Sequence, residues 1–201
     1  MKRIFKDINF IPLNWGTGKD LVIILDTNIL IYMLKSETKT QIEQILTKYQ
    51  EVIKIAKERK LEADKKIKDL NIIHAISSVS IFECLQRENQ LEYINLFKTL
   101  KCYEIDMDAQ YIAAQLKTFY AKRGISKDNL PDLYISATAL LNSSAILTAN
   151  QSDYPSILFK EVSAHQITWK ENERTRSITL YLLRPDYIKA RDNKFMTVIE
   201  G

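Results

Sequence analysis

Five consecutive apolar residues, Leu21 to Leu25, end directly on a carboxylate, Asp26, within the stretch ILDTNILIY. A run that is apolar at every position predicts a β-strand buried on both faces, which is typical of a parallel sheet covered by helices. Three more apolar residues, Ile29 to Ile31, follow the acid, and we expect a helix to open over Ile29 to Lys35. The chain therefore places a charged side chain where a buried strand meets the next element.

Strand-like and helix-like segments continue to alternate after this first pair. Apolar residues recur at helical spacing from Gln41 to Ala56, and the charged stretch that follows leaves open one long helix or two helices with a joint near residues 59 to 62. This alternation predicts an α/β fold, an α/β/α sandwich with a parallel central sheet. Further strands are predicted at Ile72–Val79, Leu100–Ile105 and Ala145–Thr148, and further helices from Ser80, from the cap Asp106 to Tyr120 before Gly124, and from Pro131.

The pattern changes beyond Pro155. Two strand-like runs, Val162 to Trp169 and Ile178 to Leu183, flank the polar segment KENERTRS and predict an antiparallel hairpin added to the end of the sheet. The length of 201 residues suits one large domain, and no linker or repeat divides it. We therefore expect a single domain over 1–201, with an N-terminal arm over 1–20 and a C-terminal extension over 160–201.

Composition excludes several classes of protein. Apolar residues make up 46% of the chain, enough for a core, and the net charge of +4 is compatible with nucleic-acid binding without indicating it. Cys84 and Cys102 form neither a disulfide framework nor a zinc-ligand spacing. No apolar run approaches the ~18 residues of a membrane span, and polar residues interrupt any signal-peptide core. We therefore expect a soluble cytoplasmic protein that does not bind membranes.

Four carboxylates lie at the predicted junctions between strands and helices. Asp26 and Asp153 follow strands, whereas Glu83 and Asp132 lie in the first turns of helices. Because ligands gather beyond the carboxyl ends of parallel strands, we expect all four acids to face one crevice. Clustered carboxylates raise one another's pKa values, and a divalent cation relieves their repulsion. Oxygen ligands suit Mg²⁺ or Mn²⁺.

Each acid also has a structural explanation. Asp26 could cap the following helix, and Glu83 could complete a capping box with Ser80. Asp132 could complement a helix dipole, and Asp153 could shape a turn. The common placement of the four acids favours a metal site over four separate structural roles.

Four stretches in this order, ILDTNILIY, SVSIFECL, PDLYISATAL and ILTANQSDY, resemble the four motifs of PIN-domain nucleases. The resemblance is closest to small bacterial ribonucleases that include the toxins of toxin–antitoxin pairs, and it covers roughly residues 20 to 160. It implies an α/β/α sandwich with a parallel central sheet. It matches the family's metal-binding acids with Asp26, Glu83, Asp132 and Asp153, and the polar residues that support the last acid with Thr148 and Asn150.

The implied chemistry is hydrolysis of phosphodiester bonds with Mg²⁺ or Mn²⁺. We assign Asp26 and Asp132 to a central ion, and Glu83 and Asp153 to water molecules around it or to a second ion. Whether one ion or two are held remains open. A metal-free ribonuclease with paired histidines is disfavoured because the two histidines of the chain lie in a strand pattern and in the tail.

Basic residues before the Asp132 helix are candidates for binding the substrate. Lys122, Arg123 and Lys127 lie nearest the acids, and we expect them either to contact phosphate or to form a solvated face.

The leading hypothesis is therefore a metal-dependent endoribonuclease that binds RNA, including the possibility of a toxin held by an antitoxin protein. The alternatives are a DNA or structure-specific nuclease that uses the same acids, and a catalytically silent nucleic-acid-binding module. An apolar stripe that includes Leu46 and Tyr49 either packs on the core or forms a homo-oligomer contact.

Overall fold

The structure is a computed structural model that describes residues 20–60, 71–193 and 195, with side chains described from Leu21 to Glu51 and from Asn71 onward. Residues 1–19 of the predicted N-terminal arm, and residues 61 and 62 of the proposed helix joint, lie outside the described residues. The strands are β1 (Asp20–Leu25), β2 (Asn71–Ser77), β3 (Lys101–Tyr103), β4 (Ala145–Thr148), β5 (Phe159–Glu171) and β6 (Arg174–Pro185). The helices are α1 (Thr27–Leu34), α2 (Ser36–Lys60), α3 (Ser78–Leu85), α4 (Gln90–Phe97), α5 (Met107–Ala121), α6 (Leu130–Leu141), the short 3₁₀ helix η3 (Gln151–Asp153) and α7 (Tyr187–Asp192).

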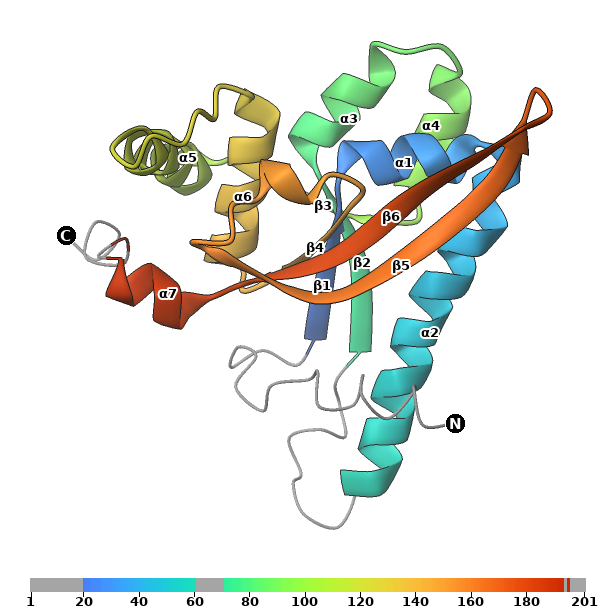
Figure 1. The fold of residues 1–201 in the computed structure, drawn as a ribbon, viewed down its shortest axis with the longest axis horizontal. Helices are drawn as coiled ribbons and strands as arrows, with labels where there is room; N and C mark the ends of the chain where they lie inside the picture. Colours follow the sequence, from blue (N-terminus) through green and yellow to red (C-terminus); the bar gives the residue numbers. More distant parts are fainter. Residues whose placement is uncertain (1–19, 61–70, 194, 196–201) are drawn as a thin grey trace.

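The strands form one six-stranded sheet in the order β3-β2-β1-β4-β6-β5 (Figure 1). Neighbouring strands from β3 to β4 run parallel, whereas β6 pairs antiparallel with both β4 and β5. The fold is therefore mixed α/β with a mostly parallel sheet. The expectation of a parallel central sheet is correct for the first four strands only.

The first strand is buried on both faces, as its unbroken apolar run predicts. Val22 and Ile24 pack into one buried cluster with α5 and α6, whereas Ile23 and Leu25 pack into a second cluster with α1 and α2. Helices therefore cover both faces of the sheet, with a core on each side. Leu46 and Tyr49 of α2 belong to the second core, which favours core packing for the apolar stripe of this helix.

The boundary between β2 and α3 differs from the prediction. The strand ends at Ser77 rather than Val79, and the helix begins at Ser78 rather than Ser80. The alternating residues Ser78, Val79 and Ser80 suit both a strand and a helix start, so the local pattern does not fix the boundary. As a consequence, Glu83 lies in the second turn of α3, and Ser80 and Glu83 do not form a capping box at its start.

The antiparallel hairpin is confirmed. Its two strands pair from Phe159–Pro185 to Glu171–Arg174, with a bulge between Glu161 and Ser163, and Figure 1 shows them as two long ribbons that run side by side. The hairpin is part of the core, because Leu180 and Leu182 are fully buried against the residues of β1 and β4.

Two helices on the same face of the sheet, α5 and α6, have the termini that their sequences predict. Asp106 caps α5 by accepting a hydrogen bond from the Ala109 amide at 2.8 Å, and Gly124 follows its end with a left-handed φ of 69°. Pro131 lies in the first turn of α6. None of the helices in the described ranges is both long and apolar enough to cross a membrane.

Candidate active site

Asp26 lies at the carboxyl end of β1, where the backbone is fixed to the neighbouring strand. Its amide donates to the Leu147 carbonyl at 3.0 Å. Its side chain is only 3% exposed and makes no capping hydrogen bond to α1, although the residue occupies the N-cap position. Its Oδ2 instead accepts hydrogen bonds from Thr148 Oγ1 at 2.7 Å and Asn28 Nδ2 at 2.6 Å. The capping explanation for this acid is therefore disfavoured.

Asn28 connects the junction between β1 and α1 with the segment that follows β4. Its Oδ1 accepts the Ala149 amide at 2.8 Å, and its Nδ2 also reaches Thr148 Oγ1 at 3.2 Å. Thr148 Oγ1 in turn accepts the Asn150 amide at 2.9 Å. Thr148 therefore supports Asp26, the first acid, whereas the family resemblance matched it with support for the last acid.

Asp153 ends the short helix η3 that follows β4. Asn150 Nδ2 donates to its Oδ2 at 2.7 Å. Lys127 Nζ lies 3.5 Å from its Oδ1 and donates to the Ser152 carbonyl at 2.5 Å. The Lys127 side chain is only 16% exposed, so this ion pair is partly shielded from solvent.

Asp132 lies in the first turn of α6, and Asn129 Nδ2 donates to its Oδ2 at 2.7 Å. Burial, together with the negative charges of Asp153, Asp26 and Glu83, raises the pKa of Asp132 to about 7. Burial likewise raises the pKa of Asp26 to about 6, while its hydrogen bonds oppose that rise. The four acids therefore lie close enough for their charges to interact.

Glu83 reaches the group from α3. Its Oε2 accepts a hydrogen bond from Thr27 Oγ1 at 2.5 Å, and Thr27 is the residue next to Asp26. The helix begins two residues earlier than expected, yet its second turn still brings the acid to the end of β1.

Tyr154 adds a hydroxyl group that sequence reasoning did not select. The side chain is 1% exposed, and its hydroxyl interacts with the Asp26 carboxyl and lowers the pKa of that acid. The hydroxyl nevertheless has no partner in good hydrogen-bond geometry among the described residues. A buried hydroxyl without a partner beside the acids marks a polar position that is incompletely satisfied.

The donor set is made of carboxylates, which suits a hard divalent cation such as Mg²⁺ or Mn²⁺. Within the described ranges, no three His, Cys, Asp or Glu side chains are already arranged as a metal-binding group. Protein sites for Mg²⁺ commonly use one or two carboxylates and keep several waters, so Asp26 and Asp132 are a sufficient protein contribution. The residues fit an ion of this class held by two acids better than a cage of four.

The three basic candidates differ in their surroundings. Lys127 forms an ion pair with Asp153. The Arg123 guanidinium lies 3.7 Å from the Phe119 ring centre and donates to the Asn193 carbonyl at 2.8 Å, so it ties α5 to the C-terminal segment. Lys122 is exposed at the end of α5. Lys127 is therefore the best placed of the three to meet a phosphate at the acids.

Sequence reasoning missed the residues that surround the acids, namely Thr27, Asn28, Asn129 and Tyr154. All four lie within three residues of an acid, and that proximity is the signal that could have selected them. The ion pair between Lys127 and Asp153 joins residues 26 positions apart and depends on the fold.

Comparisons with known proteins give little further information. No protein-family model matches the chain, and no curated protein matches it significantly. Among solved structures, a similar chain occurs in the crystal structure of VapBC2 from Rickettsia felis bound to a DNA fragment from their promoter. That match has 18% sequence identity and a TM-score of 0.45, and it covers 67% of this chain and 91% of that chain. A likeness this distant assigns the chain to no family.

Proposed function

We propose that this chain is a metal-dependent endoribonuclease of the PIN-domain type, with Mg²⁺ or Mn²⁺ held at Asp26 and Asp132. The observation that carries the proposal is the burial of these two carboxylates together, within reach of the charges of Asp153 and Glu83. A buried cluster of like charges is unfavourable unless a cation or protons neutralise it. The order of the four motifs in the sequence supports the same reading.

Each residue has a role in this proposal. The braces from Thr148 and Asn28 to Asp26, and from Asn129 to Asp132, all use Oδ2. In this proposal Oδ1 of each acid would hold the ion. When bound, the ion would activate a water molecule and neutralise charge on the scissile phosphate. Glu83 and Asp153 would orient water molecules at the site, and Lys127 would meet a phosphate oxygen.

The proposal is tested with purified protein and labelled single-stranded RNA and DNA, each with Mn²⁺ or with excess chelator. We expect cleavage of RNA only with the metal, and at least a hundredfold loss in Asp26→Asn. The double variant with Asp132→Asn should lose little more, because residues that act as a unit are not additive. Asp108→Asn, an exposed aspartate of α5, is the matched control and should retain full activity.

The outcomes separate the alternatives. Cleavage of DNA in preference to RNA would favour the DNA nuclease, and binding of RNA without any cleavage would favour the silent binding module. Cleavage that persists in chelator or in Asp26→Asn would overturn the metal-site assignment.

We further propose that the nuclease is a toxin controlled by an antitoxin protein. The motif resemblance is the support for this step. Co-expression with the product of an adjacent small reading frame should yield a complex in which RNA cleavage is suppressed, and unaltered cleavage would contradict the toxin assignment.

A further inference from the structure

A pocket of about 560 Å³ opens along the segment from Gln151 to Phe159, which contains Asp153. Gln151, Ser152 and Tyr154 of this segment line it, together with residues at the start of β5 and in α7. Its volume lies in the range of pockets that hold small ligands or single nucleotides. The same short segment therefore carries one of the acids and one wall of the pocket.

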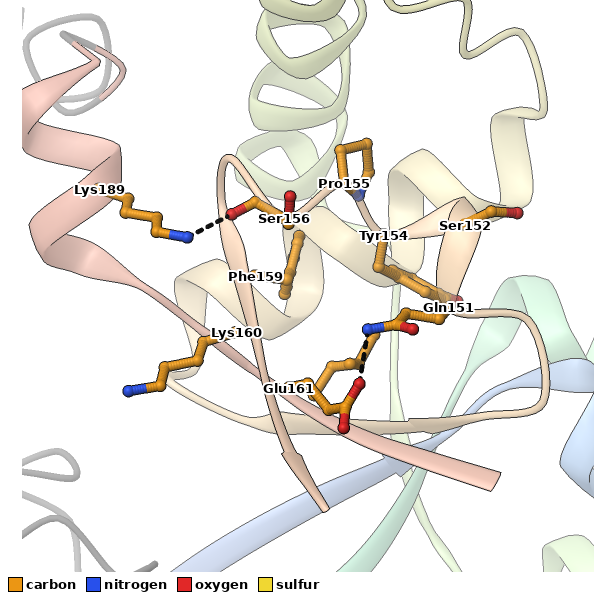
Figure 2. Close-up of a pocket in the computed structure, with 10 residues that line it drawn as sticks. Gln151, Ser152, Tyr154, Pro155, Ser156, Phe159, Lys160, Glu161 and Lys189 are labelled. Atoms are coloured by element: carbon orange, nitrogen blue, oxygen red, sulfur yellow. Dashed lines mark hydrogen bonds between the residues drawn. The ribbon is translucent and has the colours of Figure 1, made fainter. Parts of the chain in front are cut away.

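The positive charges of this pocket are gathered on one of its sides. Figure 2 shows Lys160 and Lys189 on one side and Gln151 with Glu161 on the other. Gln151 Nε2 donates to Glu161 Oε2 at 2.9 Å, so the one carboxylate of the lining already has a partner. Lys189 Nζ donates to the Ser156 carbonyl at 3.0 Å, which holds this ammonium group at the rim.

A third cation lies next to these lysines. Arg184 of β6 is the direct cross-strand partner of Lys160 of β5. Like charges directly opposite each other in an antiparallel pair repel and destabilise the pair. Within the described part of the chain, neither of these residues nor Lys189 forms an ion pair with a carboxylate. An anion bound between them would relieve the repulsion.

We propose that this pocket is a subsite for a phosphate group of the RNA strand adjacent to the scissile bond, bound by Lys160 and Lys189 with Arg184 close by. The proposal rests on the proposed function and adds where the substrate lies. A strand whose scissile phosphate is at the acids would pass over η3 and place a neighbouring nucleotide in the pocket. Positively charged grooves track single-stranded backbones in this way.

The test measures binding separately from cleavage. A labelled single-stranded RNA of ten nucleotides is titrated into the full chain in chelator, with a salt series, for the parent and for Lys160→Gln/Lys189→Gln. We expect the affinity to fall about tenfold or more, because two charge-assisted contacts are lost. The slope of log affinity against log salt should become shallower by about 0.7 for each lysine that contacts a phosphate.

The matched control is Lys98→Gln/Lys101→Gln, two exposed lysines at the β3 edge of the sheet, opposite to β5. It removes the same net charge, so it reports any general electrostatic effect. Equal affinities and salt slopes in the two double variants would overturn the subsite.

A second experiment locates the phosphate of the RNA that the two lysines contact. RNAs that carry one neutral methylphosphonate linkage, at each position in turn, are compared in the parent and in Lys160→Gln/Lys189→Gln. One neutral linkage should weaken binding to the parent and have no effect on the variant, because the contact it removes is already absent. The absence of any such position would also overturn the subsite.

Cleavage decides the proposed function independently. If the parent cleaves RNA with Mn²⁺ while Lys160→Gln/Lys189→Gln binds and cleaves like the control variant, the subsite fails and the nuclease stands. If no RNA is cleaved but binding depends on the two lysines, the nuclease fails and the pocket stands as a phosphate-binding site for RNA.

Discussion

At the scale of single residues, the acids of the site differ from ordinary helix caps in that two of them are almost excluded from solvent. Asp26 is 3% exposed and Asp132 is 7% exposed. A cap stabilises the fold that contains it, whereas a buried carboxylate near other carboxylates is held at a cost. Stability and activity therefore respond in opposite ways to its removal.

The metal-free protein should become less stable as the pH rises from about 4 to about 7. Asp26 and Asp132 have pKa values raised from 3.8 to about 6 and about 7, so the folded chain binds more protons than the unfolded chain in this window. The stability that this provides is present below the unfolded pKa values and is lost as the pH rises through the folded ones. At about 1.4 kcal/mol per pKa unit, the loss amounts to several kcal/mol for the two acids together. Thermal unfolding in chelator across this range measures it.

The control for this prediction is Asp26→Asn, which removes one titrating group and keeps its shape. At pH 7 the metal-free variant should be as stable as the parent or more stable, and its pH dependence should be weaker. The predicted pH range follows from the pKa values of Asp26 and Asp132. Three other charged residues also lie near these acids, namely Asp153, Glu83 and Lys127. A parent whose unfolding temperature is constant or increases over this range would contradict the assignment.

Asn28→Ala should have the opposite effect on stability. The substitution leaves the Ala149 amide without its acceptor and removes a brace from Asp26. An unsatisfied buried amide costs about 1–3 kcal/mol, so this variant should lose stability as well as activity. Unfolding in denaturant and RNA cleavage are measured together with those of Asp26→Asn. Unchanged stability in Asn28→Ala would show that the brace does not position the acid.

At the scale of elements, the sequence predicts the bounds of strands and helices best where one local signal dominates. β4 has the predicted bounds, and Asp106 caps α5, because the apolar residues Ala145 to Leu147 and the cap residue are local signals. The predicted end of β2 is wrong because Val79 suits a strand as well as a helix. The contacts that complete the site, such as that between Lys127 and Asp153, form between distant segments and leave no local signal.

The turn of the hairpin offers a prediction at this scale. Asn172 and Glu173 both have positive φ angles, 49° and 63°, and form the two-residue connection between β5 and β6. This conformation is typical of a type I′ turn, in which glycine is favoured at the second position. Glu173→Gly should therefore stabilise the protein by roughly 0.5 kcal/mol, since the strain relieved exceeds the entropy that glycine adds to the unfolded chain.

The measurement is thermal unfolding of Glu173→Gly beside Glu173→Val. A β-branched residue is poorly tolerated at positive φ, so the valine variant should unfold at a lower temperature than the parent. Equal unfolding temperatures for the two variants would mean that the turn does not hold the conformation described.

At the scale of the whole molecule, the predicted C-terminal extension is an integral part of the fold. β6 lies between β4 and β5, and the hairpin contributes buried side chains to the cores on both faces of the sheet. β4 is also the strand that leads to Asp153. The strands that carry the acids therefore depend on a segment that follows all four motifs in the sequence.

The last prediction tests this dependence with two leucines of different burial. Leu182 is fully buried on β6, paired with Leu147 of β4, whereas Leu91 of α4 is 69% exposed. Leu182→Ala should lower the free energy of unfolding by about 2–5 kcal/mol, because it removes transfer energy and leaves a cavity beside the strand that leads to Asp153. Leu91→Ala makes the same chemical change at the surface and should change stability by less than about 0.5 kcal/mol. Urea unfolding measures both, and similar losses would contradict a core that includes the hairpin.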